Sequence, residues 1–153
     1  MRKVGERAPD FQATDQQGRE VRLATALERG PVVLFFYPKD FTPTCTKEAC
    51  LFRDAYEELT DVAGEVIGVS LDGEDAHRRF ADRYGLPFPL LSDQSKQISK
   101  SYGVLQIFGF MTKRVTFVID AEGIIQGVFH HELSADRHVK EVRRALEELR
   151  PAG

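Results

Sequence analysis

Three apolar segments, each about as long as a β-strand, punctuate the chain. They are Pro31–Tyr37, Glu65–Ser70 and Val115–Asp120, and all are rich in β-branched or aromatic residues. Continuous rather than alternating apolar character is typical of strands buried on both faces of a sheet. A turn after the third segment leads into another apolar run, Ile124–Phe129, which predicts a hairpin. Turn residues within Asp10–Leu23 predict a second hairpin near the N-terminus.

Helical spacing of apolar residues marks three further segments. The apolar positions are Phe52, Ala55, Tyr56 and Leu59; then Ala76, Phe80 and Tyr84; and finally Val139, Val142, Leu146 and Leu149. Each set lies on one face of a helix with 3.6 residues per turn. Gly85 and Pro151 are placed to end the second and third helices.

Alternating strands and helices predict an α/β fold with a layered sheet. The hairpin after Val115–Asp120 adds an antiparallel pair, so we expect a central mixed β-sheet flanked by helices, with an N-terminal β-hairpin. No repeat, low-complexity tract or linker interrupts the chain. We therefore expect residues 1–153 to form a single domain.

Charge and hydropathy narrow the classes of function. Proteins that bind nucleic acid or a membrane surface usually do so through a basic patch. The net charge of −3 therefore argues against either function. The longest apolar run, Val32–Tyr37, is far shorter than the ~20 residues of a membrane-spanning helix. The first residues lack the apolar core of a signal peptide. These observations predict a cytoplasmic protein, whose thiols are kept reduced.

Both cysteines of the chain, Cys45 and Cys50, lie in one short segment that follows the first apolar run. Thr42 is a favourable N-cap and Pro43 a favourable first helical residue, which makes Cys45 the third residue of a helix. Unpaired backbone N–H groups and the helix dipole favour a negative charge at that place. Cys45 is therefore a candidate thiolate nucleophile.

Cys50 occupies a different face of the same predicted helix. At 100° per residue it points about 140° away from Cys45, and the two Cα atoms are about 8.6 Å apart. A disulfide requires a Cα separation of roughly 4.4–6.8 Å. The two cysteines can therefore bond only if the first turns unwind. The alternative is that both are inert and simply fill space.

The segment Tyr37–Cys50, YPKDFTPTCTKEAC, resembles the active-site run of peroxiredoxins, in particular the bacterioferritin-comigratory (Q-type) branch. Further matches to the family's pattern extend over nearly the whole chain: Val4–Gly18, Val66–Asp72, Phe88–Asp93 and Lys113–Asp120. Two features depart from that pattern. Thr44 replaces a common glycine, and the segment Tyr102–Arg114 is shorter and more apolar than in many relatives.

The resemblance implies a thioredoxin-like fold and a thiol peroxidase that reduces hydrogen peroxide and organic hydroperoxides in antioxidant defence. Cys45 corresponds to the peroxidatic cysteine, and Pro38, Thr42 and Arg114 complete its pocket. Cys50 corresponds to the resolving cysteine. An intrachain Cys45–Cys50 disulfide, reduced again by thioredoxin or a similar dithiol protein, follows from this correspondence.

The same resemblance implies no metal, haem, flavin or other cofactor. It favours a monomer over a dimer, because an intrachain resolving cysteine removes the need for a second subunit. The apolar segment Leu105–Met111 could nevertheless support a dimer. Within it, Phe108, Phe110 and Met111 fit an apolar approach to Cys45 or an interaction patch, and filling of the core is the default interpretation.

Several polar residues have more than one interpretation. Glu48 lies one turn after Cys45 and could orient Arg114 or relay a proton, or it could be a solvated carboxylate. The pair His130-His131 suggests a metal, but the cysteines lack a standard zinc spacing, so we expect none.

Three further charged or polar residues are not assigned a function. His77 lies in a charged helical segment and is expected at the surface. Lys39 and Asp40 are interpreted as loop charges.

Two other classes of protein remain as alternatives. A general disulfide oxidoreductase would share the fold but typically uses Cys-x-x-Cys, a closer spacing than that of Cys45 and Cys50. A binding module with inert cysteines would leave no identifiable site in the sequence.

Overall fold

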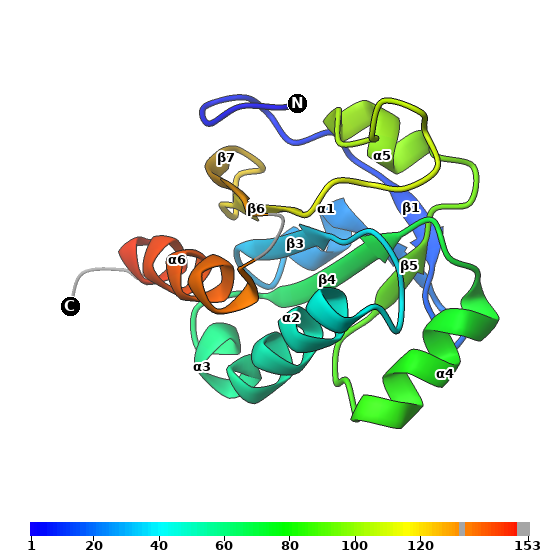
Figure 1. The fold of residues 1–153 in the computed structure, drawn as a ribbon. Coiled ribbons are helices and arrows are strands. Elements are labelled where there is room, and N and C mark those ends of the chain that lie inside the picture. Colours follow the sequence, from blue (N-terminus) through cyan, green and yellow to red (C-terminus); the bar gives the residue numbers. More distant parts are fainter. Residues whose placement is uncertain (132–133, 150–153) are drawn as a thin grey trace.

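The computed structural model describes residues 1–131 and 134–149 (Figure 1). Its elements are, in order, β1 (Gln12–Thr14), β2 (Glu20–Arg22), α1 (Leu23–Leu27), β3 (Val32–Phe36), α2 (Pro43–Asp54), α3 (Tyr56–Thr60), β4 (Glu65–Ser70), α4 (Glu74–Tyr84), β5 (Leu90–Ser92), α5 (Gln97–Tyr102), β6 (Val115–Ile119), β7 (Ile125–His130) and α6 (Ala135–Glu148). Pro151, predicted to end the last helix, lies outside the described residues.

Five strands form one mixed sheet in the order β5-β4-β3-β6-β7. The central strand β3 runs parallel to β4 and antiparallel to β6, so that Leu34 lies opposite both Ile67 and Phe117. The predicted mixed sheet is therefore confirmed, as are the hairpin β6–β7 and the separate N-terminal hairpin β1–β2.

Both faces of β3 are buried, as its continuous apolar sequence predicts. Val33 and Phe35 belong to a core shared with α2, α4 and α6. Leu34 and Phe36 belong to a second core, on the other face, shared with α1 and α5. Figure 1 shows α2, α4 and α6 together on one side of the sheet. The residues of α2 that carry the cysteines thus rest on the first of these two faces.

Gly68 of β4 makes room for an aromatic contact that seats α2. A Cβ atom at this position would lie 2.7 Å from Cζ of Phe35 and 2.8 Å from Cδ2 of Leu90. The Phe35 ring stacks on Phe52 of α2, with centroids 4.7 Å apart. The missing side chain therefore lets the ring lie flat between the sheet and the helix.

The helices agree with the predicted periodicity in most respects. Helix α4 ends at Gly85, which has the expected left-handed conformation (φ 62°). The predicted helix after the cysteines is divided at Ala55, which leaves the helical conformation (φ −93°, ψ 1°). The short elements α1, β5 and α5 were not predicted, because three to six residues are too few to show a period. Within the described ranges, no helix combines the length and apolar character needed to cross a membrane.

Candidate active site

Cys45 is the third residue of α2, as predicted. The helix begins at Pro43, Thr42 has an extended conformation, and the backbone N–H of Thr46 donates the first helical bond to the Thr42 carbonyl (2.8 Å). The N–H groups of Thr44 and Cys45 precede this bond and have no acceptor within the helix. The Cys45 side chain is 1% exposed and lies in the core beneath α2.

Thr42 occupies the N-cap position, but its side chain does not cap the helix. Its hydroxyl donates instead to the carbonyl oxygen of Lys39 (2.8 Å) and so closes the loop that precedes α2. The predicted N-cap position of Thr42 is therefore confirmed, although its hydroxyl binds the loop and not the first-turn N–H groups. The Thr42 side chain therefore does not bind the N–H groups of the first turn, which adjoin Cys45.

Arg114 connects Cys45 to the sheet. It directly precedes β6 and is 3% exposed. Its Nη2 donates to the Cys45 sulfur at 3.2 Å, and its Nη1 donates to Oε1 of Glu48 at 3.0 Å. Burial disfavours the charged guanidinium, but the facing Glu48 carboxylate and Cys45 sulfur outweigh it and raise the pKa of Arg114. The arginine is therefore a fixed cation against the candidate nucleophile.

Glu48 is fully buried, so the interpretation as a solvated carboxylate is wrong and its contact with Arg114 is confirmed. Its second oxygen, Oε2, lies 3.4 Å from Nε2 of His138 in α6. The same ring nitrogen is 2.5 Å from the hydroxyl oxygen of Thr116. Burial, followed by the charges of nearby histidines and Arg114, lowers the pKa of His138 to about 3.

Sequence reasoning missed His138, although a signal for it exists. His138 belongs to the buried stripe of α6, which also contains Ala135, Val139, Val142 and Leu146. A polar residue within an apolar stripe requires a polar partner in the core. Here those partners are the Thr116 hydroxyl and the Glu48 carboxylate.

The loop between β3 and α2 carries a second buried polar cluster. Asp40 and His77 are 5% and 0% exposed, so the interpretations of Asp40 as a loop charge and of His77 as a surface residue are both wrong. Oδ2 of Asp40 lies 2.6 Å from Nδ1 of His77, and the Tyr37 hydroxyl donates to Oδ1 of Asp40 (2.6 Å). Burial first, and then Asp40, raise the pKa of Tyr37 well above its usual value.

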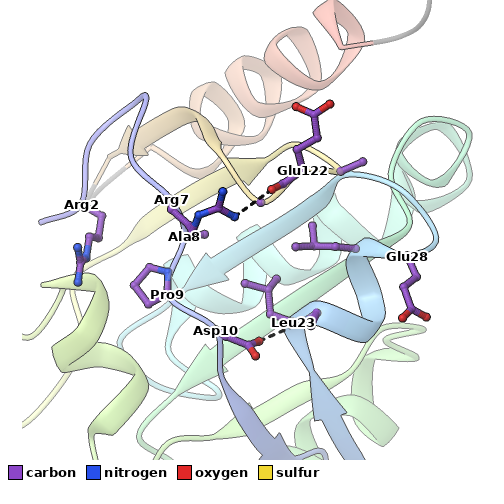
Figure 2. A pocket seen from close by; sticks show the side chains of 12 residues that line it. Arg2, Arg7, Ala8, Pro9, Asp10, Leu23, Glu28 and Glu122 are labelled. Carbon is purple, nitrogen blue, oxygen red and sulfur yellow. Dashed lines mark hydrogen bonds between the residues drawn. The ribbon is translucent and has the colours of Figure 1, made fainter.

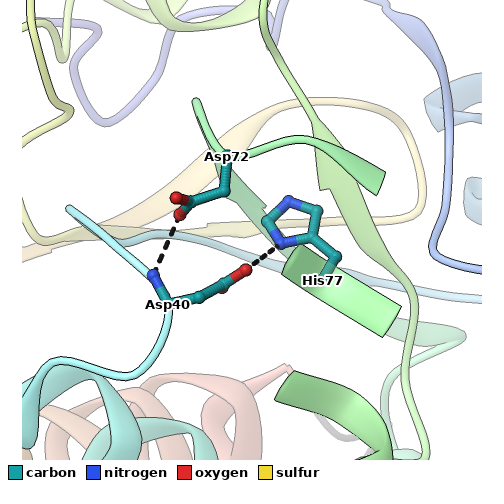
Figure 3. A group of neighbouring side chains, drawn as sticks. All are labelled: Asp40, Asp72 and His77. Carbon is teal, nitrogen blue, oxygen red and sulfur yellow. Dashed lines mark hydrogen bonds and ion pairs between the residues drawn. The ribbon is translucent and has the colours of Figure 1, made fainter. Parts of the chain in front are cut away.

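Three side chains in the described part of the chain are close enough to hold a metal ion together: Asp40, Asp72 and His77, with ligand atoms within 4.8 Å of one another (Figure 3). Each is already hydrogen-bonded within the protein. These bonds support a structural role for the cluster.

Pro38 is half-buried in the same loop. The preceding carbonyl, that of Tyr37, accepts a buried hydrogen bond from the Thr112 hydroxyl (2.8 Å). Thr112 lies two residues before Arg114, so this bond ties the arginine-bearing segment to the loop of Pro38 and Thr42. The structure thus brings Cys45, Glu48 and Arg114 into direct contact and places Pro38 and Thr42 on the adjoining loop.

Cys50 is half-buried on α2, and both cysteines are free thiols. Because α2 is continuous from Pro43 to Asp54, both lie in one intact helix. The ideal Cα separation of about 8.6 Å therefore applies to them.

The apolar segment after α5 does not fill the core. Ile107, Phe108 and Phe110 are 94%, 81% and 78% exposed. The default interpretation of core filling is therefore wrong for both phenylalanines. A bridge between Leu105 and Thr112 holds the segment as a tight loop, which presents the apolar side chains to solvent.

A pocket of about 570 Å³ is lined by none of the residues around Cys45. Its walls come from the N-terminal segment, α1 and the turn between β6 and β7 (Figure 2). Within it Arg7 donates to the Glu122 carbonyl and Asp10 accepts from the backbone of Ala24. Leu23, which lines this pocket, belongs to the core on the sheet face opposite Cys45. The pocket is therefore separate from the cysteine site.

Comparison with known proteins places this geometry in a family. Residues 4–128 match the model of the AhpC/TSA family. The chain is 41% identical over 147 residues to the chloroplastic peroxiredoxin Q of Sedum lineare, covering 95% of this chain and 78% of the relative.

Solved structures agree with this assignment and with the expected thioredoxin-like fold. Peroxidoxin BcpB of Mycobacterium tuberculosis superposes with a TM-score of 0.92 at 38% identity, covering 99% of this chain and 100% of that one. The bacterioferritin comigratory protein of Xanthomonas campestris, which has alkyl peroxide reduction activity, gives a TM-score of 0.81 at 27% identity, covering 90% of each chain.

The predicted cytoplasmic location is contradicted by the curated relatives, because the Sedum lineare protein and others like it are chloroplast proteins. Lack of a recognised signal peptide was the basis of that prediction, and it does not distinguish the cytosol from an organelle. The predicted family and enzyme class are confirmed. The chain belongs to the AhpC/TSA family and, within it, to the Q-type branch of the peroxiredoxins, which are thiol peroxidases.

Proposed function

We propose that Cys45 is the peroxidatic nucleophile of this thiol peroxidase. The observation that carries the proposal is the hydrogen bond of 3.2 Å from Nη2 of Arg114 to the Cys45 sulfur, at the third position of α2. A thiolate is the reactive form of cysteine, and a facing cation together with helix N–H groups favours it.

The thiolate attacks one peroxide oxygen, and the O–O bond breaks. The sulfur is oxidised by two electrons to a sulfenic acid, and the other oxygen leaves as hydroxide or alkoxide, which takes a proton from solvent to give water or an alcohol. Negative charge develops on the leaving oxygen during this step. Arg114 and the N–H groups of Thr44 and Cys45 are donors fixed before the reaction, so they stabilise that charge without reorganising.

Thr42 and Pro38 orient and shield the peroxide in this proposal. The hydroxyl hydrogen of Thr42 is engaged with the Lys39 carbonyl, which leaves the lone pairs of its oxygen to accept a hydrogen bond from the peroxide O–H. Pro38 has no N–H and a rigid ring. It forms an apolar wall that keeps water from the nucleophile.

Glu48 holds Arg114 in place. Its oxygen binds one nitrogen of the guanidinium, which leaves the second nitrogen directed at Cys45. The planar fork of arginine makes this double contact possible. Because Oε1 of Glu48 is engaged in this ion pair, we assign Glu48 the role of orienting Arg114 and not that of a proton relay.

Cys50 is proposed to resolve the sulfenic acid. Unwinding of the first turns of α2 brings its thiol to Cys45, a disulfide forms, and water leaves. A dithiol protein such as thioredoxin then reduces the disulfide by exchange.

Because both cysteines belong to one chain, the cycle needs no second subunit, and we propose a monomer. Residues 1–153 are proposed to form one domain, since both cores share one sheet.

Mass spectrometry after one equivalent of hydrogen peroxide tests the proposal. The expected product is a single chain that has lost two hydrogen atoms. After digestion, the peptide that contains Cys45 should be cross-linked to the peptide that contains Cys50. A chain of doubled mass would contradict the intrachain disulfide. Consumption of peroxide in the presence of thioredoxin and its reductase is expected, and full activity of a Cys45→Ser variant would refute the role of Cys45.

A further inference from the structure

Asp40 is bound on three sides in the middle of the loop that links β3 to α2. Its backbone N–H donates to Oδ2 of Asp72 (2.9 Å), and its side chain binds Tyr37 and His77 as described above. Figure 3 shows Asp40 joined to both other members of the cluster, to Asp72 through its backbone nitrogen and to His77 of α4 through its carboxylate. Asp72 is itself fixed by the hydroxyl of Ser70 (2.7 Å). The loop is thus attached to β4 and α4 through one residue.

The ring of His77 is held at both nitrogens. Nε2 lies 3.0 Å from the carbonyl oxygen of Leu91, which can only accept, so Nε2 carries a proton. Nδ1 lies 2.6 Å from Oδ2 of Asp40, a distance that requires one proton between the two atoms. Imidazolium with carboxylate, and imidazole with carboxylic acid, both satisfy this geometry. Either way the pair is neutral overall and its bonds are complete, which suits a fully buried position.

The next residue shows why the loop needs such an attachment. Phe41 has φ +66°, a conformation that is unfavourable for a bulky side chain. Its ring is 47% exposed and packs edge-on against Phe80 of α4, with centroids 5.1 Å apart. A strained residue keeps its conformation only where its surroundings impose it. Asp40 on one side and the contact with Phe80 on the other supply that constraint.

We propose that Asp40, locked by His77, is a positioning residue for the peroxidase reaction. It fixes the loop 38–42 in the conformation that presents Pro38 and Thr42 to the peroxide at Cys45. It acts through the loop and does not touch the reacting atoms. This inference rests on the proposed role of Cys45 as nucleophile.

The two chemical steps respond differently to a looser loop. Attack on peroxide requires the folded loop, because a small displacement of orienting groups slows a reaction strongly. Formation of the disulfide requires the first turns of α2 to open, and the loop leads directly into them. Loss of the attachment at Asp40 is therefore expected to slow the first step without slowing the second.

Rapid chemical quench measures both steps. Samples are trapped with a 1,3-dione, which captures sulfenic acid, and with an alkylating agent, and the products are counted by mass spectrometry. In the Asp40→Ala protein we expect oxidation of Cys45 to slow by about tenfold or more. Asp40→Asn is isosteric, since its amide oxygen accepts from Tyr37 and its NH₂ donates to Nδ1 of neutral His77. Its rate should stay within about threefold of the wild type. Asp82→Ala, an exposed position on α4, is the matched control and should leave the rate unchanged.

Hydrogen exchange separates a local effect from general destabilisation. Faster exchange in Asp40→Ala is expected in residues 38–46 but not in β6 or α6. Equal oxidation rates in the wild type and Asp40→Ala, or faster exchange throughout the protein, would overturn the proposal. Should Asp40→Ala fail to fold, Asp40→Ser replaces it with the same expectation, because its hydroxyl is too short to reach His77. Failure of the wild type itself to oxidise Cys45 would refute the proposed function instead.

Discussion

Arg114 donates a hydrogen bond to the sulfur of Cys45, a residue 69 positions earlier in the chain. The register of the sheet explains this contact. Val115, the first residue of β6, lies opposite Phe36, the last residue of β3. The residue before β6 therefore emerges beside the loop that leads into α2. Antiparallel pairing of β3 with β6 is what brings the Arg114 guanidinium to the Cys45 sulfur.

Replacing Arg114 by lysine tests this arrangement. Lysine keeps the charge but lacks the planar fork, so one ammonium cannot serve Glu48 and Cys45 in the geometry that is observed. We expect the rate constant for oxidation of Cys45 to fall by about 10- to 100-fold, measured by rapid quench. Arg137→Lys, an exposed arginine of α6 paired with Glu141, is the matched control. A rate like that of the wild type would show that charge alone suffices.

The parts of the fold that leave a signal within one short segment of the chain could be predicted from the sequence. The strands β3, β4 and β6 match continuous apolar runs, and the start of α2 follows from Thr42, Pro43 and the chemistry of helix ends. The position of Cys45 at the third residue of that helix depended on local rules alone. The preferences of residues at helix ends suffice at the start of α2 because the groups that bond there are near neighbours in the chain.

The buried polar clusters could not be predicted in the same way. His77 stands in a charged segment, yet it lies on the inner face of α4 with Phe80 and Ala81. Its partner Asp40 comes from another element 37 positions away. Such pairs depend on tertiary contacts, which local patterns do not contain. The exposed Phe108 shows the converse, because an apolar residue need not be buried.

The stability of the protein should depend on pH through His138. Its pKa is about 3 in the folded state, against about 6.5 when unfolded. Between these values the unfolded chain binds a proton that the folded protein does not, so stability falls as the pH drops from 6.5 towards 3 and is unaffected above 6.5. At pH 5 the loss from this group is about 2 kcal/mol relative to pH 8.

Denaturant unfolding of the wild type and His138→Gln measures this contribution. The variant should lose less stability than the wild type on going from pH 8 to pH 5. Lys140→Gln, at an exposed position of the same helix, is the control and should follow the wild type. Identical pH dependence in all three proteins would exclude a buried neutral His138.

Gly68→Ala should destabilise the protein. The new methyl group would overlap Phe35 and Leu90, both fully buried, and overpacking of this kind costs about 1–3 kcal/mol. In a Phe35→Leu background the same substitution should cost less, because the smaller side chain leaves the space. Additive effects in this double-mutant cycle, measured by urea unfolding, would argue against the overlap.

Cys50→Ser should separate oxidation from resolution. Cys45 and its partners Arg114 and Glu48 are untouched, so the variant should consume one equivalent of peroxide at a rate close to that of the wild type. It should then stop and accumulate a sulfenic acid, visible as the gain of one oxygen atom in the intact mass. Continued turnover with thioredoxin would assign the resolving role to another thiol.

The exposed loop after α5 should contribute little to stability, although its sequence is as apolar as a core segment. The Phe110 side chain is 78% exposed, so Phe110→Ala is expected to change the free energy of unfolding by less than about 0.5 kcal/mol. Phe117→Ala, the same substitution at a fully buried position of β6, should cost about 3–5 kcal/mol.

Sedimentation of the Phe110→Ala protein should match the wild type if both are monomers. A lower sedimentation coefficient in the variant would instead identify the loop as an interface between two copies of the chain.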